Sequence, residues 1–416
     1  SLFIVVCCCC CCCVPSALFP SLYYYFLKPI DTYDRHTRST HILCFLSTKS
    51  NNKQAKAKTK TKITQTFYIS LSLSPPFEEI YIYTHRHQIL LQQQPKNKMS
   101  AAAATTTAKQ LLMTVHESIK SIRSMRKKLP SSLSVGYVPT MGALHDGHLS
   151  LVKEARSKND VVIASIFVNP TQFGKGEDLD KYPRQMEQDS KLLQEFGVDH
   201  LFAPNKELMY GKNHMTFVDP IGFDDIPEGV SRPGHFRGVA TVVTKLFNIV
   251  QPTNAYFGQK DAAQCTLIRR IVDDLNMDVN VQVLDTIRET DGLAMSSRNA
   301  YLTPKERMIS PVVYKSLCAA KQFYHMIFLG SVSSMEEEDG KATEGKEFSI
   351  PSNTLRDIVE EVLRSEPLVT DIQYVSVDDR ETMRPIDVVG KDGAVISLAC
   401  KVGSVRLIDN IVLKIG

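Results

Sequence analysis

Two histidines three residues apart, His145 and His148, lie in a glycine-bearing stretch whose residue types suit phosphate chemistry. The apolar run 135–138 before them is typical of a buried strand that ends at Pro139, and the periodicity of 149–156 predicts a helix. A loop between a strand and a helix presents backbone N–H groups and the positive end of the helix dipole to an anion. The spacing can aim both imidazoles at one phosphate, so the stretch predicts an adenylating site. An isolated pair of this kind is also typical of histidines that cap a helix.

The elements that would position these histidines alternate between helices and buried strands. The spacing of apolar residues predicts an amphipathic helix over 109–128. The continuous apolar run 160–168 predicts a central parallel strand, followed by a polar loop with Asn169 and Gln172. Open α/β sheets bind ligands at such carboxyl ends. Further strands are expected at 200–203, 255–257 and 279–284.

The alternation of strands and helices ends near Thr286. We place a domain boundary there, between a first domain, 99–286, and a second domain, 287–416. The second domain is expected to be smaller and α+β. One long helix is predicted over 304–328, and a polar, acidic insert near 330–349 is typical of a disordered surface loop. Strands are expected at 372–377, 395–399 and 405–408.

Composition excludes several classes of protein. At 416 residues and 43% hydrophobic residues, the chain can bury more than one core. The net charge of +4 is mild, and no basic tract is interleaved with aromatics, so nucleic acid is not an expected partner. Beyond residue 98 the cysteines are Cys265, Cys318 and Cys400, without CxxC spacing, which argues against a disulfide framework or a zinc site. We expect a reducing compartment, the cytosol.

Residues 1–98 differ in composition from the rest of the chain. They hold no methionine, a cysteine run at 7–13 and a Lys/Thr-rich run at 53–62. The apolar stretch 2–27 leaves a membrane anchor or signal peptide as an alternative, but it lacks a positively charged start. Homopolymeric runs fall outside ordinary globular usage. We interpret 1–98 as a non-native or disordered extension, with translation starting at Met99, and expect no membrane partner.

Six motifs, in order and spacing, relate the segment from Met99 to Gly416 to one family. They read PTMGALHDGH, FVNPTQFG, YPR, SRPGHFRG, FGQKD and DGLAMSSRNAYLT. Together they resemble the pantothenate synthetases, or pantoate-β-alanine ligases. HxGH sequences occur also in nucleotidylyltransferases and class I aminoacyl-tRNA synthetases. A nucleotidylyltransferase and a non-catalytic nucleotide-binding protein are therefore the alternatives.

The resemblance implies a Rossmann-like domain that binds ATP and pantoate, a smaller α+β lid domain, Mg²⁺ dependence and a homodimer. It implies that the pantoate carboxylate attacks ATP to give pantoyl adenylate and pyrophosphate. The amine of β-alanine then attacks the acyl carbon and releases pantothenate and AMP. Positioned positive groups and hydrogen-bond donors are what such an attack between two anions requires.

The resemblance also implies roles for particular residues. His148, His145 and Lys260 are the expected catalytic residues, with His148 as the proton donor. Gln172, Gln264 and Asn169 are expected to bind pantoate and β-alanine, and Asp189 is the expected metal ligand. The expected ATP-binding residues are Met141, Gly142, His145, His148, Gly258, Lys260, Asp261, Ile287, Met295, Ser296, Ser297 and Arg298.

One loop departs from the family's usual pattern of GEKD, an aromatic residue and two glutamines. Gln259 replaces the glutamate, and Ala262 and Ala263 replace the aromatic residue and the first glutamine, while Gln264 is retained. These departures affect the expected packing around the ribose more than the chemistry, so we expect activity to survive. Without the family, Asn169 to Gln172 would be read as an ordinary turn and Asp189 as an exposed helix aspartate.

Overall fold

A computed structural model describes residues 31–33, 40–42, 112–333 and 348–414. The chain forms two units, Ser1–Thr106 and Thr107–Gly416. The described part of the first unit is a pair of antiparallel strands, β1 (Asp31–Tyr33) and β2 (Thr40–Ile42). The remaining expectations for 1–98, and most of those for the insert near 330–349, lie outside the described residues. Among the described helices, none is long and apolar enough to cross a membrane.

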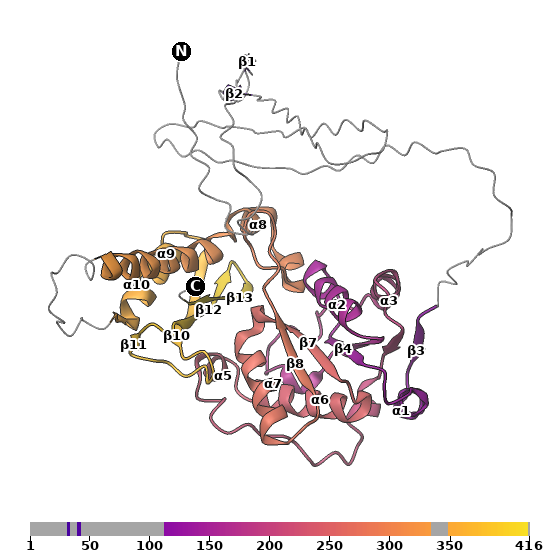
Figure 1. Cartoon of the computed structure of the whole chain (residues 1–416). Helices are drawn as coiled ribbons and strands as arrows, with labels where there is room; N and C mark the ends of the chain where they lie inside the picture. Colours follow the sequence, from indigo (N-terminus) through magenta and orange to yellow (C-terminus); the bar gives the residue numbers. More distant parts are fainter. Residues whose placement is uncertain (1–30, 34–39, 43–111, 334–347, 415–416) are drawn as a thin grey trace, which may run out of the picture. The chain divides into compact units, whose positions relative to one another are not determined.

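The second unit opens with a six-stranded parallel sheet in the order β3-β6-β5-β4-β7-β8 (Figure 1). The central strand β4 pairs with β5 on one side and β7 on the other, and Tyr137 lies opposite both Ile163 and Ala255. The strands are β3 (Thr114–His116), β4 (Val135–Thr140), β5 (Val161–Ile166), β6 (His200–Phe202), β7 (Asn254–Gly258) and β8 (Asn280–Leu284). The expected Rossmann-like α/β fold is confirmed.

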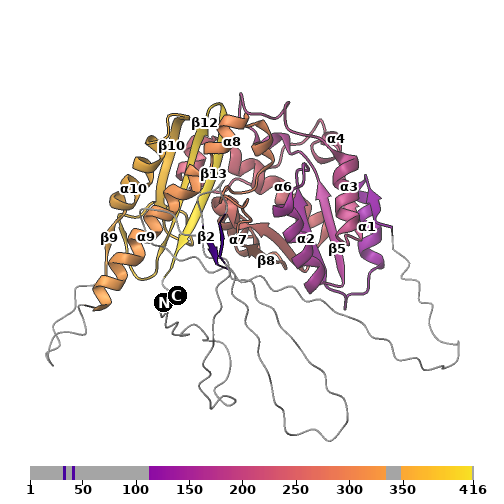
Figure 2. The same ribbon diagram turned by 90° about the horizontal axis from the view of Figure 1, so that it is seen from above.

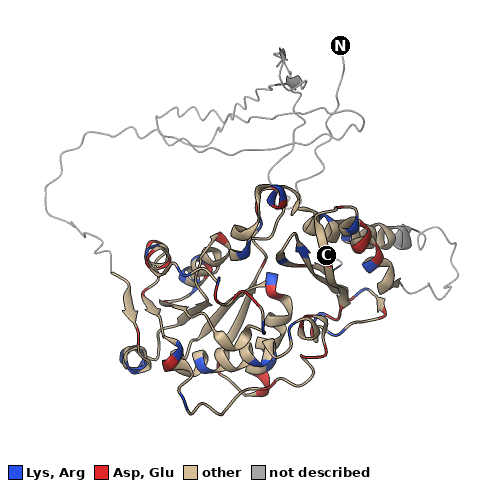
Figure 3. Cartoon of the chain, turned by 180° about the vertical axis from the view of Figure 1, so that it is seen from behind, with Lys and Arg blue, Asp and Glu red and all other residues tan. Residues whose placement is uncertain are grey.

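Helices cover both faces of this sheet, because successive side chains of a strand point to opposite faces. Tyr137 and Ile163 are buried in the core that includes helices α1, α6 and α7. Val138 and Val162 are buried on the other face, with α2 and α3 (Figure 1). These helices are α1 (Ile119–Lys128), α2 (Asp146–Lys158), α3 (Met186–Glu195), α6 (His235–Val250) and α7 (Ala262–Asp274). Basic and acidic residues are interspersed along the described helices (Figure 3).

The order of the strands reverses at β4, which places the crevice of the fold there. Strands β5 and β6 continue on one side of β4, whereas β7 and β8 lie on the other. Loops that leave the carboxyl ends of β4 and β7 therefore flank the point where open α/β sheets bind ligands. The first loop leads into α2, and the second contains the 3₁₀ turn η2 (Gln259–Asp261) before α7.

The expected helix over 109–128 is wrong in its first half. Residues 114–116 form strand β3, which pairs with β6 at the edge of the sheet, and the helix begins only at Ile119. The Ser118 side chain accepts a hydrogen bond from the backbone N–H of Ser121 and so caps the helix. Leu112 and Val115 are 76% and 48% exposed, so they do not form the buried face that their spacing suggested.

Prolines explain two further differences in element boundaries. Strand β4 continues through Pro139 to Thr140. Its pairing with β7 ends at Tyr137, so no hydrogen bond to β7 requires an N–H at Pro139. The single helix expected over 304–328 is two helices, α8 (Pro304–Ile309) and α9 (Val312–Ser333). Pro311 separates them because proline cannot donate to the helical hydrogen-bond pattern.

The smaller C-terminal part is α+β, as expected. Its sheet is antiparallel, with β12 between β10 and β13, and helices α9 and α10 pack against it (Figure 2). Strand β13 also contacts η2, and β10 contacts the short helix α5 (Pro227–Ser231). The remaining elements are α4 (Lys206–Met209), β9 (Ile350–Pro351), α10 (Ser352–Arg364), β10 (Val369–Asp378), β11 (Val388–Val389), β12 (Ala394–Val402) and β13 (Val405–Leu413).

Helix α6 approaches the 3₁₀ turn η1 (Pro170–Gln172) closely at Gly238. A Cβ at this position would lie 2.3 Å from the backbone oxygen of Thr171. The Gly238 carbonyl accepts a hydrogen bond from the Asn169 side chain at 3.2 Å. Glycine is therefore required for the packing that holds η1, and with it Gln172.

We expect Gly238→Ala to lower the free energy of unfolding by about 1–3 kcal/mol, because the new methyl group overlaps backbone atoms that must move. Chemical denaturation measures the change. Gly211→Ala is the matched control, since the nearest atom to its new Cβ is the Glu207 carbonyl oxygen at 3.8 Å. The interpretation is wrong if both variants unfold at the same denaturant concentration as the unsubstituted protein.

Candidate active site

The two histidines form a capping box at the start of helix α2. His145 is the N-cap, and its Nδ1 accepts a hydrogen bond from the Gly147 N–H at 3.2 Å. The Nδ1 of His148 accepts one from the His145 N–H at 3.4 Å, and the two ring centroids lie 4.1 Å apart. Because each Nδ1 is an acceptor, each neutral ring carries its proton on Nε2. Both Nε2–H groups are thus available as hydrogen-bond donors.

Both imidazoles are neutral at physiological pH. Burial, assisted by the charge of Lys260, lowers the pKa of His145 to about 4. Burial, with the neighbouring His145 and Lys260, lowers the pKa of His148 to about 3. In the free protein the pair therefore offers N–H hydrogen bonds rather than imidazolium protons.

Asp189 holds the backbone just before the histidines. It is 1% exposed, and its two carboxylate oxygens accept the N–H groups of Ala143 and Leu144 at 2.8 and 2.9 Å. Gly142 has a φ of +86°, and a Cβ there would lie 3.0 Å from the Asp189 carboxylate, so glycine suits the turn. Asp189 as a metal ligand stays a prediction, and the structure gives both of its oxygens another partner. The described residues contain no cluster of three His, Cys, Asp or Glu side chains suited to a metal ion.

The second loop places Lys260 and Asp261 at the switch point. The Lys260 ammonium lies 3.8 Å from the Asp261 carboxylate. Burial raises the pKa of Asp261, but Lys260 and Arg298 lower it further, so the net shift is downward and the carboxylate is charged. Gly258, which precedes the loop, has open space around its Cβ position, so packing does not require a glycine there.

The segment from Met295 to Arg298 lies against the histidine loop. Ser297 donates a hydrogen bond from its hydroxyl to the Ala143 carbonyl at 3.1 Å. Arg298 donates two hydrogen bonds to the Asp178 carboxylate, both at 2.9 Å. Its guanidinium is therefore already paired, and a contact with phosphate would have to be shared with Asp178. Both residues belong to the 3₁₀ turn η3 (Ser297–Tyr301).

The preceding residues are organised by backbone contacts. Ser296 caps η3 by accepting the Arg298 N–H at 3.3 Å. The Ile287 carbonyl accepts the Met295 N–H at 3.0 Å, so its backbone oxygen is already engaged, and the Ile287 side chain is exposed. The structure therefore brings the predicted Met295 to Arg298 segment to the histidines and leaves Ile287 at the surface.

The predicted acid-binding residues Asn169 and Gln172 are buried at the end of β5. The Asn169 amide donates to the Gln172 side-chain oxygen at 2.9 Å, and its own oxygen accepts the Tyr210 hydroxyl at 2.8 Å. These contacts orient the Gln172 amide. Gln264 lines a pocket with Lys260 and residues of β10 and β13, which encloses about 520 Å³ of space, part of it open to solvent.

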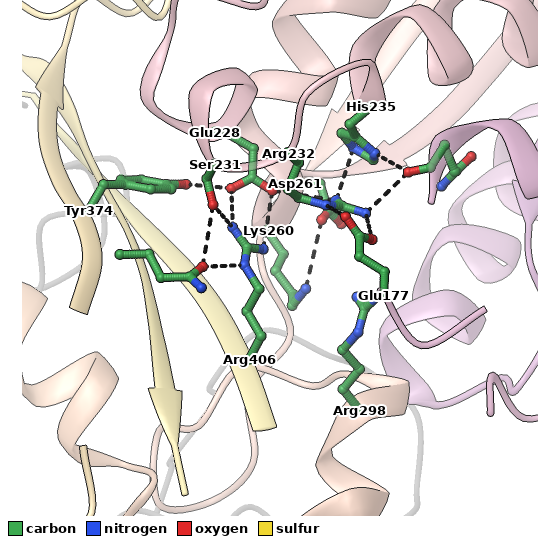
Figure 4. Close-up of polar contacts among 12 residues, drawn as sticks. Glu177, Glu228, Ser231, Arg232, His235, Lys260, Asp261, Arg298, Tyr374 and Arg406 are labelled. Atoms are coloured by element: carbon green, nitrogen blue, oxygen red, sulfur yellow. Dashed lines mark hydrogen bonds and ion pairs between the residues drawn. The ribbon is translucent and has the colours of Figure 1, made fainter. Parts of the chain in front are cut away.

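A largely buried hub of charged residues, which the sequence did not predict, lies beside this pocket (Figure 4). Its members are Glu177, Glu228, Arg232 and Arg406. Arg232 donates to the Glu177 carboxylate at 2.7 and 3.0 Å and to the Gln172 carbonyl at 3.3 Å. Glu228 lies 3.4 Å from Arg232 and accepts from Arg406 of β13 at 2.6 Å. In the sequence, Arg232 suggests either a cation that steers anions or a residue of a dimer interface. Glu228 and Arg406 are 178 positions apart, and no local pattern predicts their contact.

Charge pairing and burial shift the pKa of Glu228, a member of the hub, in opposite directions. Burial raises the pKa of Glu228, but the guanidinium groups of Arg406 and Arg232 lower it further, so Glu228 is ionised. His235 contacts Arg232 at 3.1 Å and the Gln172 carbonyl at 2.8 Å. Burial, with the charge of Arg232, lowers the pKa of His235 to about 4, so this ring is neutral.

The family model described as pantoate-beta-alanine ligase matches residues 110–412. The pantothenate synthetase of Fervidobacterium nodosum is 46% identical over 304 residues, which cover 73% of this chain and 100% of the relative. The pantothenate synthetase of Thermotoga neapolitana is 47% identical over 304 residues, 73% of this chain and 99% of the relative.

Solved structures agree with these relatives. The pantothenate synthetase from Thermus thermophilus has a TM-score of 0.63 and 41% identity, covering 73% of this chain and 100% of that one. The pantoate-beta-alanine ligase from Francisella tularensis, solved with beta-gamma ATP and beta-alanine, has a TM-score of 0.55 and 35% identity, covering 73% of this chain and 99% of that one. The chain described here belongs to the pantoate-β-alanine ligase family.

Proposed function

We propose that this chain catalyses the reaction of its family, the ATP-dependent condensation of pantoate with β-alanine to pantothenate. The observation that carries the proposal is the convergence at the β4 switch point of two neutral imidazole donors, Lys260 and the Ser297 segment. The complex of the Francisella relative with an ATP compound and β-alanine supports the same substrates here.

The first step forms an acyl adenylate. A pantoate carboxylate oxygen attacks the α-phosphorus of ATP, the bond to the β-phosphate oxygen breaks, and pyrophosphate leaves. The Nε2–H groups of His145 and His148, the N-terminus of α2 and the Lys260 ammonium stabilise the charge on the phosphate oxygens. Neutral imidazoles suit this task because each already carries a proton on Nε2 and can donate a hydrogen bond to a phosphate oxygen without first being protonated. Ser296, Ser297 and Arg298 are proposed to hold the leaving pyrophosphate.

The second step transfers the acyl group. The neutral amine of β-alanine attacks the acyl carbon, a C–N bond forms, and the bond between that carbon and the phosphate oxygen breaks to release AMP. The nitrogen releases one proton to the solvent as the amide forms. The amides of Gln172 and Gln264 are proposed to hold the acid and then the amine substrate. The contact from Asn169 to Gln172 at 2.9 Å supports this role, because it fixes the orientation of the amide before substrate arrives.

We propose that Met141, Gly142, Gly258, Asp261 and Ile287 line the nucleotide site. Their places around the β4 and β7 loops support this assignment, with Ile287 at its exposed edge. A structure with bound ATP would test it; nucleotide density away from both loops would exclude it.

We propose that Mg²⁺ enters with the phosphates of ATP. The described residues hold no cluster of three His, Cys, Asp or Glu side chains suited to a metal ion. Asp189, the predicted ligand, already accepts two backbone N–H groups, so the protein would supply at most part of the coordination shell. Phosphate oxygens and water commonly supply most ligands of such ions. Calorimetric titration of Mg²⁺ into the nucleotide-free protein should show no binding, while chelation should stop turnover; tight binding without ATP would contradict the proposal.

Residues 99–286 and 287–416 are proposed to act as an ATP- and pantoate-binding domain and a lid. Contacts from η3 to Ala143 and Asp178 support the lid, because they connect the two segments at the site. ATP should slow hydrogen exchange in η3. Unchanged exchange there with saturating ATP would remove the lid role.

A homodimer in the cytosol is proposed from the family. Met215 and Ile221 are 87% and 99% exposed, which supports a protein contact at their loop. The free thiols of Cys265 and Cys400 are buried, in accord with a reducing compartment. Light scattering should give twice the chain mass, with Ile221→Asp shifting it toward a monomer, and cell fractionation would test the compartment.

Isotope exchange between pyrophosphate and ATP is the direct test of the reaction. Exchange should require pantoate and proceed without β-alanine, because the adenylate forms before the amine is used. Adding β-alanine should then yield pantothenate and AMP in equal amounts. A nucleotidylyltransferase would keep AMP on its product, and exchange without pantoate, or none, would count against the ligase.

Two substitutions of His148, to asparagine and to glutamine, distinguish the roles of its Nδ1 and Nε2 atoms. Asparagine can retain the capping acceptor near the Nδ1 position but loses the distal donor, whereas glutamine places an N–H near the Nε2 position. We expect His148→Asn to lower the exchange rate about 10²–10³-fold, and His148→Gln to lower it less. Since the His148 pKa is about 3, the rate should show no His148 ionisation near pH 6.5. Equal losses in the two variants would argue against the donor role.

A further inference from the structure

Strand β13 inserts a polar side chain, Asn410, against the Lys260 loop. The residue is 4% exposed, and its side-chain amide donates to the carbonyls of Gln259 and Lys260 at 2.9 and 2.8 Å. Its oxygen accepts the Gln259 side-chain amide at 3.3 Å. Both the donors and the acceptor of the Asn410 side chain therefore form hydrogen bonds with the first two residues of η2.

Asn410 is itself held rigidly by a buried ion pair. The neighbouring Asp409 forms two hydrogen bonds with Arg288, at 2.6 and 3.0 Å, and accepts the Asn410 N–H at 2.8 Å. The Arg288 guanidinium lies 3.6 Å from the ring centroid of Tyr314. Because a bidentate pair between a guanidinium and a carboxylate has little freedom, the Asn410 side chain starts from a fixed position.

The Lys260 loop lacks side-chain caps of its own. Gly258, the N-cap of η2, has no side chain, and Asp261, the N-cap of α7, makes no capping hydrogen bond. The side chain that donates to the Gly258 carbonyl is a weak donor, the Cys265 thiol, at 3.3 Å. The two hydrogen bonds from Asn410 are thus the main side-chain restraints shown on this turn.

We propose that Asn410 is a positioning residue that sets where the Lys260 ammonium stands at the phosphate site. The inference rests on the proposed function. Fixing the carbonyls of Gln259 and Lys260 fixes two successive peptide planes and so the direction in which the Lys260 side chain leaves the backbone. A lysine side chain is long and flexible, so a stationary starting point reduces the space that its ammonium samples. The C-terminal sheet thereby contributes to the phosphate site through a single amide.

A double-mutant cycle with Lys260 tests this role. Asn410→Leu keeps the number and branching of the side-chain heavy atoms and removes both donors. We expect it to lower the pantoate-dependent exchange rate at least about tenfold and raise KM for ATP, with KM for pantoate little changed. In a Lys260→Ala background the same substitution should lower the rate less than about twofold, because the group it positions is gone. Equal fold losses in both backgrounds would overturn the proposal.

Two further variants keep the test interpretable. Asn410→Ala also removes both donors and adds neither bulk nor charge, so it replaces Asn410→Leu if the latter does not fold, and the same non-additivity is expected. Asn248→Leu is the matched control, because this exposed asparagine donates to the Thr244 carbonyl at 2.9 Å on helix α6 and should leave exchange unchanged. A wild-type protein without exchange would refute the proposed function itself, whereas normal wild-type exchange with additive losses refutes only the role of Asn410.

Discussion

The start of helix α2 imposes the constraint on which the site depends, because its first backbone N–H groups need partners and must also face a ligand. The imidazoles of His145 and His148 meet both demands, since each ring caps with Nδ1 and presents Nε2–H outward. Burial keeps both rings neutral, which preserves the acceptor that the cap requires. Asp189 fixes the turn before them through two backbone N–H groups, so the donors are in place before any nucleotide arrives.

Charged residues connect the C-terminal sheet with η1, which holds Gln172, the proposed acid-binding residue. Glu228 is surrounded by Arg232, Arg406 and Tyr374, and Arg232 continues the contact to the Gln172 carbonyl. Burying such groups costs desolvation energy, and their mutual attraction offsets it only with good geometry. Through these contacts Arg406 links β13 to helix α5, and Arg232 links α5 to η1. The same strand reaches the phosphate end through Asn410.

The departures in the second nucleotide loop are accommodated by the same strand. Gln259, where the family pattern usually has glutamate, donates its amide to the oxygen of Asn410 at 3.3 Å. A glutamate would have no N–H to donate to that oxygen. Ala262 is buried in the main core, and Ala262 and Ala263 line the pocket beside Gln264. The replacements therefore change the packing between η2 and the C-terminal sheet and leave Lys260 and Asp261 in the loop.

The sequence by itself determined the fold class, most strands and the glycine-bearing loops that follow β4 and β7, because buried parallel strands and the loops between them leave local patterns. It misplaced the helix over 109–128, since the edge pairing of β3 with β6 overrides apolar spacing that local sequence shares with a helix. Tertiary structure alone decided that Asp189 holds a backbone turn and that Glu228 and Asn410 reach the site from distant segments. Such contacts arise when segments distant in the chain meet in the fold, and a single side chain carries no local signal of a partner that lies 46, 150 or 178 positions away.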